Sequence, residues 1–230
     1  MRLKDMMVRY LLLPGGWRAN AAAAVMIAVL ATLLYVPAAL AFPYRAQFGT
    51  TTVFADKPIA PVMAERLARA DRLLAASPID VPGIRRQVVL TDGGWRWRIM
   101  ALGMSGAIAL RRPFGNVLVF NRNDVAADRV WNGAAIAGER TLSGTIAHET
   151  THMLIARRYG ELAAWRLPTW KAEGYADHVA QETSVTDGDE ARLRAAYPRS
   201  PALVYYEGRR RVAAVLARNG GSVDRLMTGK

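Results

Sequence analysis

Apolar and polar positions repeat with two different periods along this chain. Apolar residues recur every three to four positions in "PVMAERLARADRLLAA", residues 61–76, which predicts an amphipathic helix. Three short runs rich in apolar residues predict strands instead: "RRQVVL" (85–90), "WRWRIMAL" (95–102) and "NVLVFN" (116–121). The "DGG" at 92–94 stands between the first two runs as a hairpin turn would.

Helices are predicted in the second half of the chain. Thr141 or Ser143 can cap a helix that Gly160 ends, and "LPTWKAEGYADHVA", residues 167–180, begins another near Thr169. A closing helix is expected from about Val212 to Arg218. No internal repeat is present.

The longest apolar run lies near the N-terminus. Residues 21–42 contain no charge and would extend about 33 Å as a helix, matching a bilayer core of about 30 Å. Five charged residues precede this run: Arg2, Lys4, Arg9 and Arg18 against Asp5. By the positive-inside rule, residues 1–20 are cytoplasmic and the rest of the chain lies outside the cytoplasm.

Two interpretations of this N-terminal run stay open. It fits an uncleaved transmembrane anchor, and it also fits a signal peptide, because "ALA" at 39–41 resembles a signal-peptidase site. If residues 1–41 are cleaved, the protein is secreted. In both cases we expect residues 43–58 to be a tether and residues 59–230 to form one domain.

Composition narrows the class of protein. The chain has 31 Lys and Arg against 19 Asp and Glu, a net charge of +12, and it has no cysteine, so no disulfide can stabilise it. The alternation of Trp and Arg at 95–98 is found in nucleic-acid binders, but it fits a strand better, so we expect no nucleic-acid partner. Four arginines form a C-terminal basic stretch that fits a solvated helix face, anionic lipid or an acidic partner: Arg209, Arg210, Arg211 and Arg218.

The candidate chemistry lies in "TIAHETTHMLIARRYG", residues 145–160. His148 and His152 are four positions apart, so a helix places both on one face, one turn apart, with Glu149 beside them. This H-E-x-x-H pattern is typical of zinc sites in which two histidines hold the ion and the glutamate is the general base. The same segment also fits an ordinary amphipathic helix in which the histidines are incidental.

A third ligand has few possible sources. The extended pattern H-E-x-x-H-x-x-G-x-x-H is excluded by Ile155 and Arg158, and cysteine is absent. Glu161 would lie about 13 Å along the helix axis from His152. Glu173, on the following helix, is therefore the expected ligand.

These motifs together resemble a known family. "HETTH" followed by "WKAEGYAD" is similar to the gluzincin branch of the zincin metallopeptidases, the thermolysin- and aminopeptidase-like superfamily. The resemblance implies an α+β, minimal zincin-like domain, with a strand near 117–120 along the cleft. It also implies one zinc per chain, held by His148, His152 and Glu173, with Glu149 as catalytic base.

Two further roles follow from the resemblance alone. Asp177 would accept a hydrogen bond from the outer nitrogen of His148. By helix geometry, and not by the resemblance, His178 points about 100° away from Asp177, so we expect no ligand role for it. A tyrosine would stabilise the oxyanion of the reaction, and we favour Tyr206, with Tyr205 the alternative and Tyr197 a further candidate.

The sequence thus predicts a membrane-anchored zinc metallopeptidase that hydrolyses peptides or proteins outside the cytoplasm. The alternative is a non-catalytic, zincin-like domain that binds metal or a protein at the membrane. Cleavage specificity and oligomeric state are not predicted.

Overall fold

A computed structural model describes residues 16–229, which fall into two units that meet in the sequence between Ala41 and Phe42. Residues 1–15, with most of the predicted cytoplasmic charges, lie outside the described residues. Helices are combined with two small sheets, in agreement with the predicted α+β class.

The first unit consists of α2 (Gly16–Tyr35) and the 3-10 helix η1 (Pro37–Leu40). By length and composition α2 can cross a membrane, although a signal sequence would pass the same test. The predicted apolar span ran to residue 42, but the helix ends at Tyr35. Pro37 explains this end, because a residue before proline avoids helical backbone angles, and Val36 has φ −120° and ψ 83°.

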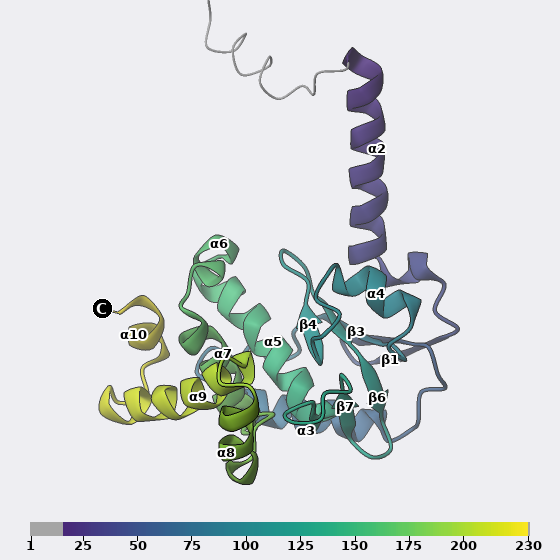
Figure 1. The fold of residues 1–230 in the computed structure, drawn as a ribbon. Coiled ribbons are helices and arrows are strands. Elements are labelled where there is room, and N and C mark those ends of the chain that lie inside the picture. The colour runs from purple at the N-terminus through teal and green to yellow at the C-terminus, as the bar shows by residue number, and fades with distance from the viewer. Residues whose placement is uncertain (1–15, 230) are drawn as a thin grey trace, which may run out of the picture. The chain divides into compact units, whose positions relative to one another are not determined.

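The main sheet of the second unit has five strands in the order β1-β2-β3-β5-β4 (Figure 1). The three inner strands are parallel, and each outer strand is antiparallel to its neighbour. Their bounds are β1 (Tyr44–Phe48), β2 (Thr51–Ala55), β3 (Arg86–Leu90), β4 (Ala109–Arg111) and β5 (Val117–Phe120). The strand predicted to line the cleft, β5, is therefore internal, and β4 is the edge strand next to it.

Two predictions about local structure are wrong. The expected tether at 43–58 contains β1 and β2, which pair with each other and join β3. The expected strand at 95–102 is the helix α4 (Trp95–Ala101). Its buried residues Trp97, Met100 and Ala101 are spaced three and one apart, as on a helix face, and Gly93 with φ 81° turns the chain into it.

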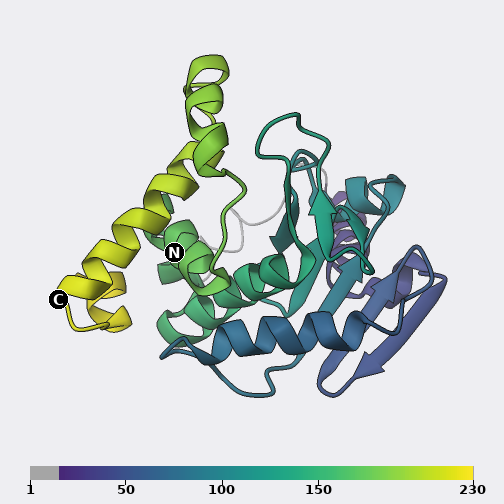
Figure 2. The ribbon, with the colours of Figure 1, turned by 90° about the horizontal axis from the view of Figure 1, so that it is seen from below.

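Helices cover both faces of this sheet. Figure 1 shows α3 (Met63–Ala75) on one side of the sheet and α4 on the other, and Figure 2 shows α3 beside the green α5 (Leu142–Tyr159). Apolar residues of β2, β3 and β5 join those of α3 and α5 in one core, with members such as Val88, Phe120, Leu67 and Ile146. Burial on both faces explains the continuous apolar runs of the inner strands.

A second, antiparallel sheet leads directly into α5. Its strands are β6 (Arg122–Asp124), β7 (Arg129–Trp131) and β8 (Glu139–Thr141). The chain then continues through α6 (Glu161–Trp165), α7 (Thr169–Ala180), α8 (Asp187–Ala196), α9 (Pro201–Arg218) and α10 (Val223–Thr228). The closing helix predicted from Val212 is thus the second half of the longer α9.

Candidate metal centre

The start of α5 is fixed by side chains from other elements. Thr141 caps the helix by accepting from the Gly144 amide at 3.0 Å, and its own hydroxyl donates to Glu182 at 2.7 Å. Asp128 accepts from both the amide and the hydroxyl of Ser143. Gly160 ends the helix, as predicted. These contacts set the rotation of α5 and therefore the direction in which its histidines point.

Three predicted ligand atoms converge on one point. The Nε2 atoms of His148 and His152 are 3.2 Å apart, and Glu173 Oε2 lies 3.3 Å from the first and 3.4 Å from the second. A tetrahedral zinc bound at 2.0–2.1 Å separates its ligand atoms by about 3.3 Å. The triangle therefore has the size that such an ion requires.

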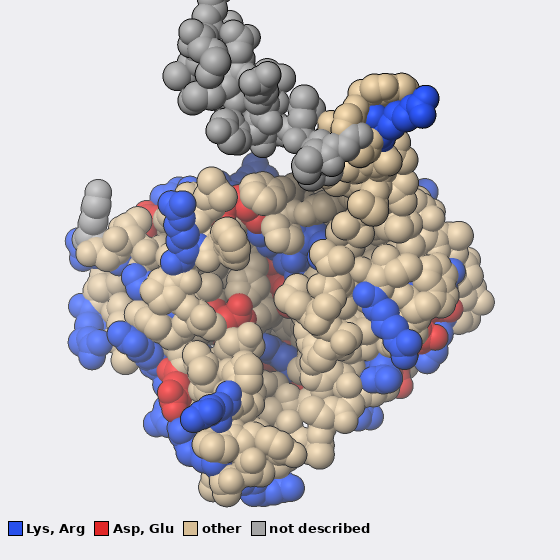
Figure 3. Space-filling view, turned by 45° about the horizontal axis from the view of Figure 1, so that its top comes forward, with Lys and Arg blue, Asp and Glu red and all other residues tan. Residues whose placement is uncertain are grey.

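Access to this triangle is uneven. The His148 side chain is 6% exposed, whereas those of His152 and Glu173 are 19% and 22% exposed. Glu149 is buried on the same turn of α5. Figure 3 shows a hollow in the surface of the second unit, with acidic side chains inside it. Solvent can therefore reach the ligand atoms from the side of His152 and Glu173.

The predicted support for His148 is in place, and it extends one residue further. In the tautomer that leaves Nε2 free, His148 Nδ1 donates to Asp177 Oδ1 at 2.7 Å. Arg140, a buried residue of β8 that the sequence analysis missed, pairs with the same carboxylate oxygen at 2.8 Å and with Glu182 at 3.3 Å. This contact could not be predicted from the sequence, because the short strand that carries Arg140 was itself not predicted.

The charges at the centre are strongly coupled. Burial and the charge of Arg140 lower the pKa of His148, but hydrogen bonds to Asp177 and Glu173 outweigh them and raise it to about 10. Burial raises the pKa of Glu173, but the positive charge and hydrogen bonds of the two histidines outweigh it and hold this pKa far below its usual range. Without a metal ion, protons must lie between the nitrogen and oxygen atoms of the triangle. A bound metal ion would replace those protons.

A contact between two glycines places α9 against the ligand helix α7. A Cβ on Gly174 would overlap the backbone of Gly208, and a Cβ on Gly208 would crowd the backbone of Trp170. The glycine that follows Glu173 therefore lets the two helices touch. This contact brings the tyrosines of α9 toward the metal centre.

The structure separates the three tyrosine candidates. Burial raises the pKa of Tyr205, and so do the negative charges of Glu173 and Glu149, so Tyr205 lies close enough to sense the centre. Tyr206, the favoured candidate, instead donates to Asp187 at 2.7 Å. Tyr197 is 60% exposed at the end of α8. The bond that engages Tyr206 with Asp187, together with the charges of Glu173 and Glu149 that act on Tyr205, favours the alternative, Tyr205.

The remaining candidates lie apart from the triangle. His178 stacks against Tyr175 with ring centroids 6.3 Å apart, and Glu161 pairs with Arg111. Neither belongs to the convergent group of His148, His152 and Glu173, whose ligand atoms all lie within 4.8 Å of one another.

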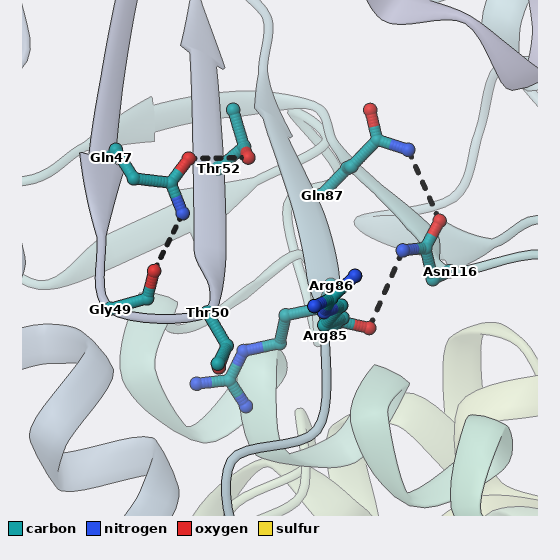
Figure 4. Close-up of a pocket in the computed structure, with 8 residues that line it drawn as sticks. All are labelled: Gln47, Gly49, Thr50, Thr52, Arg85, Arg86, Gln87 and Asn116. Carbon is teal, nitrogen blue, oxygen red and sulfur yellow. Dashed lines mark hydrogen bonds between the residues drawn. The ribbon is translucent and has the colours of Figure 1, made fainter.

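Two concave surfaces lie outside the triangle. A pocket of about 700 Å³ borders the support of His148, since Arg140, Thr141 and Glu182 line it. A polar pocket of about 420 Å³ lies where the β1–β2 turn meets the first residues of β3 (Figure 4). Polar side chains of this second pocket bond to each other, as Gln87 does to Asn116, so it is not a candidate catalytic site.

Compared with protein families, with curated proteins and with solved structures, the chain has no match. The assignment of a function therefore depends on the chemistry of the residues described above.

Proposed function

We propose that this chain is a zinc metallopeptidase of the gluzincin type, anchored in a membrane by α2 and acting on peptides or proteins outside the cytoplasm. The observation that carries the proposal is the triangle of His148, His152 and Glu173, with edges of 3.2 to 3.4 Å.

The donor set fits zinc better than the common alternatives. Magnesium and calcium prefer oxygen ligands, whereas two neutral imidazoles and a carboxylate are a typical catalytic zinc set with one position open for water. The partial exposure of His152 and Glu173 gives a water molecule access to that position. A single zinc ion per chain would use all three side chains of the triangle as its ligands.

The residues of the chain divide the reaction between them. When bound, zinc lowers the pKa of a water molecule to about 7. Glu149 accepts a proton from the attacking water and returns it to the leaving amine. Tyr205 donates its phenolic proton in a hydrogen bond to the oxyanion that forms on the peptide carbonyl. Asp177 and Arg140 hold the His148 ring in its tautomer and orientation.

An extended substrate would pair with β4 rather than with β5. Among the described strands β4 pairs only with β5, and it packs beside α5, which carries Glu149. A peptide added to that open edge would gain main-chain hydrogen bonds next to the catalytic helix.

The location follows from the N-terminal sequence. The apolar helix α2 and the basic residues before it support an anchor with a cytoplasmic N-terminus. A reporter fused after Lys230 should be active only if it functions outside the cytoplasm. A mature N-terminus near Phe42 would show a cleaved signal instead.

Replacing Glu149 with Gln tests the peptidase mechanism. Gln keeps the size of the side chain but cannot accept the proton of water, so peptide hydrolysis should fall by about 10² to 10⁴ while zinc content stays unchanged. The assay uses a peptide library and the full chain in detergent. If the zinc-loaded wild type cleaves nothing, or Glu149→Gln cleaves equally well, the non-catalytic binding domain becomes the better proposal.

A further inference from the structure

Three large apolar side chains project into solvent near the end of α5. Phe114, in the β4–β5 turn, is 73% exposed, and Leu162 and Trp165 of α6 are 57% and 84% exposed. The ion pair between Arg111, at the end of β4, and Glu161, at the start of α6, joins the two elements. The three side chains therefore belong to one region of the surface.

The local backbone is shaped to display these side chains. Phe114 has φ 57°, a left-handed conformation that is strained for a bulky residue, in the turn Pro113-Phe114-Gly115. The short helix α6 has no buried residue. Neither feature is explained by the packing of the core, since the aromatic rings of Phe114 and Trp165 face water.

Unbalanced positive charge surrounds the same region. Arg157 and Arg166 are exposed and have no ion pair within residues 16–229, while the acidic neighbour Glu161 is already paired with Arg111. We call Phe114, Leu162, Trp165, Arg157 and Arg166 the apolar–basic patch. Aromatic side chains combined with arginine suit the interface of an anionic bilayer, where rings enter the headgroup layer and guanidinium groups meet lipid phosphates.

We propose that the apolar–basic patch docks the second unit onto the anionic surface of the membrane that α2 crosses. This step rests on the anchor role proposed above, because a bilayer attached to the same chain is present at high effective concentration. Docking would restrict the rotation of the domain about its anchor and hold the catalytic cleft in a fixed orientation to the membrane.

The chain contains no cysteine, so single cysteines can be labelled without background. Phe114→Cys, Leu162→Cys and Trp165→Cys are labelled with a fluorophore in the full chain, which is reconstituted in nanodiscs whose lipids carry a nitroxide quencher. The matched control is Tyr197→Cys, 60% exposed at the C-terminal end of α8, which lies at the opposite end of the unit from α6 (Figure 1). Discs contain phosphatidylcholine with or without phosphatidylglycerol.

If the patch docks, labels at 114, 162 and 165 should be quenched several-fold more than the label at 197. This difference should be large only in discs that contain phosphatidylglycerol. Added salt, or Arg157→Glu combined with Arg166→Glu, should reduce this difference. Equal quenching at 165 and 197 would overturn the proposal. Self-quenching between labels, without quenching by the lipid, would also overturn it, because it would show that the patch binds a second copy of the chain. Chains that do not stay with the discs would refute the anchor, and zinc content, measured on the same samples, tests the metal centre separately.

Discussion

The two histidines of the metal centre differ in their surroundings. His148 is buried, and a chain of contacts through Asp177 and Arg140 holds its outer nitrogen. His152 is 19% exposed and, like Glu173, faces the accessible side of the triangle. The comparison separates a buried inner half, which would orient a bound ion, from a more exposed outer half, which would admit water and substrate in the proposed reaction.

Removing either histidine should have the largest effect. His148→Ala and His152→Ala should each weaken zinc binding by more than the roughly 100-fold expected for an outer-sphere partner, because a direct ligand is lost. Only His148→Ala should also destabilise the metal-free fold, by about 1–3 kcal/mol, since Asp177 loses a buried hydrogen-bond donor. Zinc titration and thermal denaturation without metal measure the two effects. Equal destabilisation by both variants would remove the distinction between the two halves.

The next effect concerns the open half and separates the two tyrosines. Tyr205→Phe should lower kcat by about 10² while zinc content remains normal, because one oxyanion donor is lost. Tyr206→Phe, which removes a hydroxyl that bonds to the acidic residues Asp187 and Glu190 of α8, is the matched control and should retain most activity. Steady-state peptide hydrolysis decides between them, and the reverse ranking would restore Tyr206 as the oxyanion residue.

A smaller effect is expected in the inner half. Asp177→Asn keeps the size of the side chain but removes the charge that orients His148, so zinc affinity should fall by about 10- to 100-fold. Glu182→Gln is the control, because Glu182 bonds to the same arginine without touching a histidine, and the amide oxygen of Gln can still accept from the Thr141 hydroxyl that caps α5. Competition with a zinc chelator measures both affinities. Similar losses in the two variants would mean that Arg140, rather than Asp177, controls the ligand.

The last test concerns the contact between α7 and α9, which places Tyr205 near Glu173 in the outer half. Gly174→Ala places a methyl group against Gly208 and should cost about 1–3 kcal/mol of stability by separating α7 from α9. Activity should fall as well, since Tyr205 moves away from Glu173. Gly188→Ala, on α8 where nothing lies closer than 4.0 Å, should leave both properties unchanged or slightly raise stability. Denaturant unfolding and peptide hydrolysis check the pair.

The convergence of His148, His152 and Glu173 could be predicted from the sequence because much of its geometry is local. The four-residue spacing of His148 and His152 places them on one helical face, and exclusion of other sources leads to Glu173. Tyr205 and Tyr206 could not be separated in this way. They are adjacent on α9, and which of them faces the centre depends on how Gly174 and Gly208 pack.

Other features also depended on contacts distant in sequence. Arg140 reaches Asp177 only after β8 and α7 have come together. Residues 95–98 alternate Trp and Arg, which suggests a strand, but packing of Trp97 and Met100 into the core selects a helix. The β1–β2 hairpin, in the range predicted as a tether, joins the sheet only through β3 at residues 86–90, so the local sequence does not reveal it.

Zinc content is the most direct test of the central claim that His148, His152 and Glu173 hold one metal ion. The full chain, purified without added metal, then equilibrated with a small excess of zinc and freed of unbound zinc by gel filtration, is measured by elemental analysis. We expect about one zinc per chain in the wild type and in Glu149→Gln, and little in Glu173→Ala. A wild type that holds no zinc, or a Glu173→Ala variant that holds as much as the wild type, would contradict the proposed metal centre.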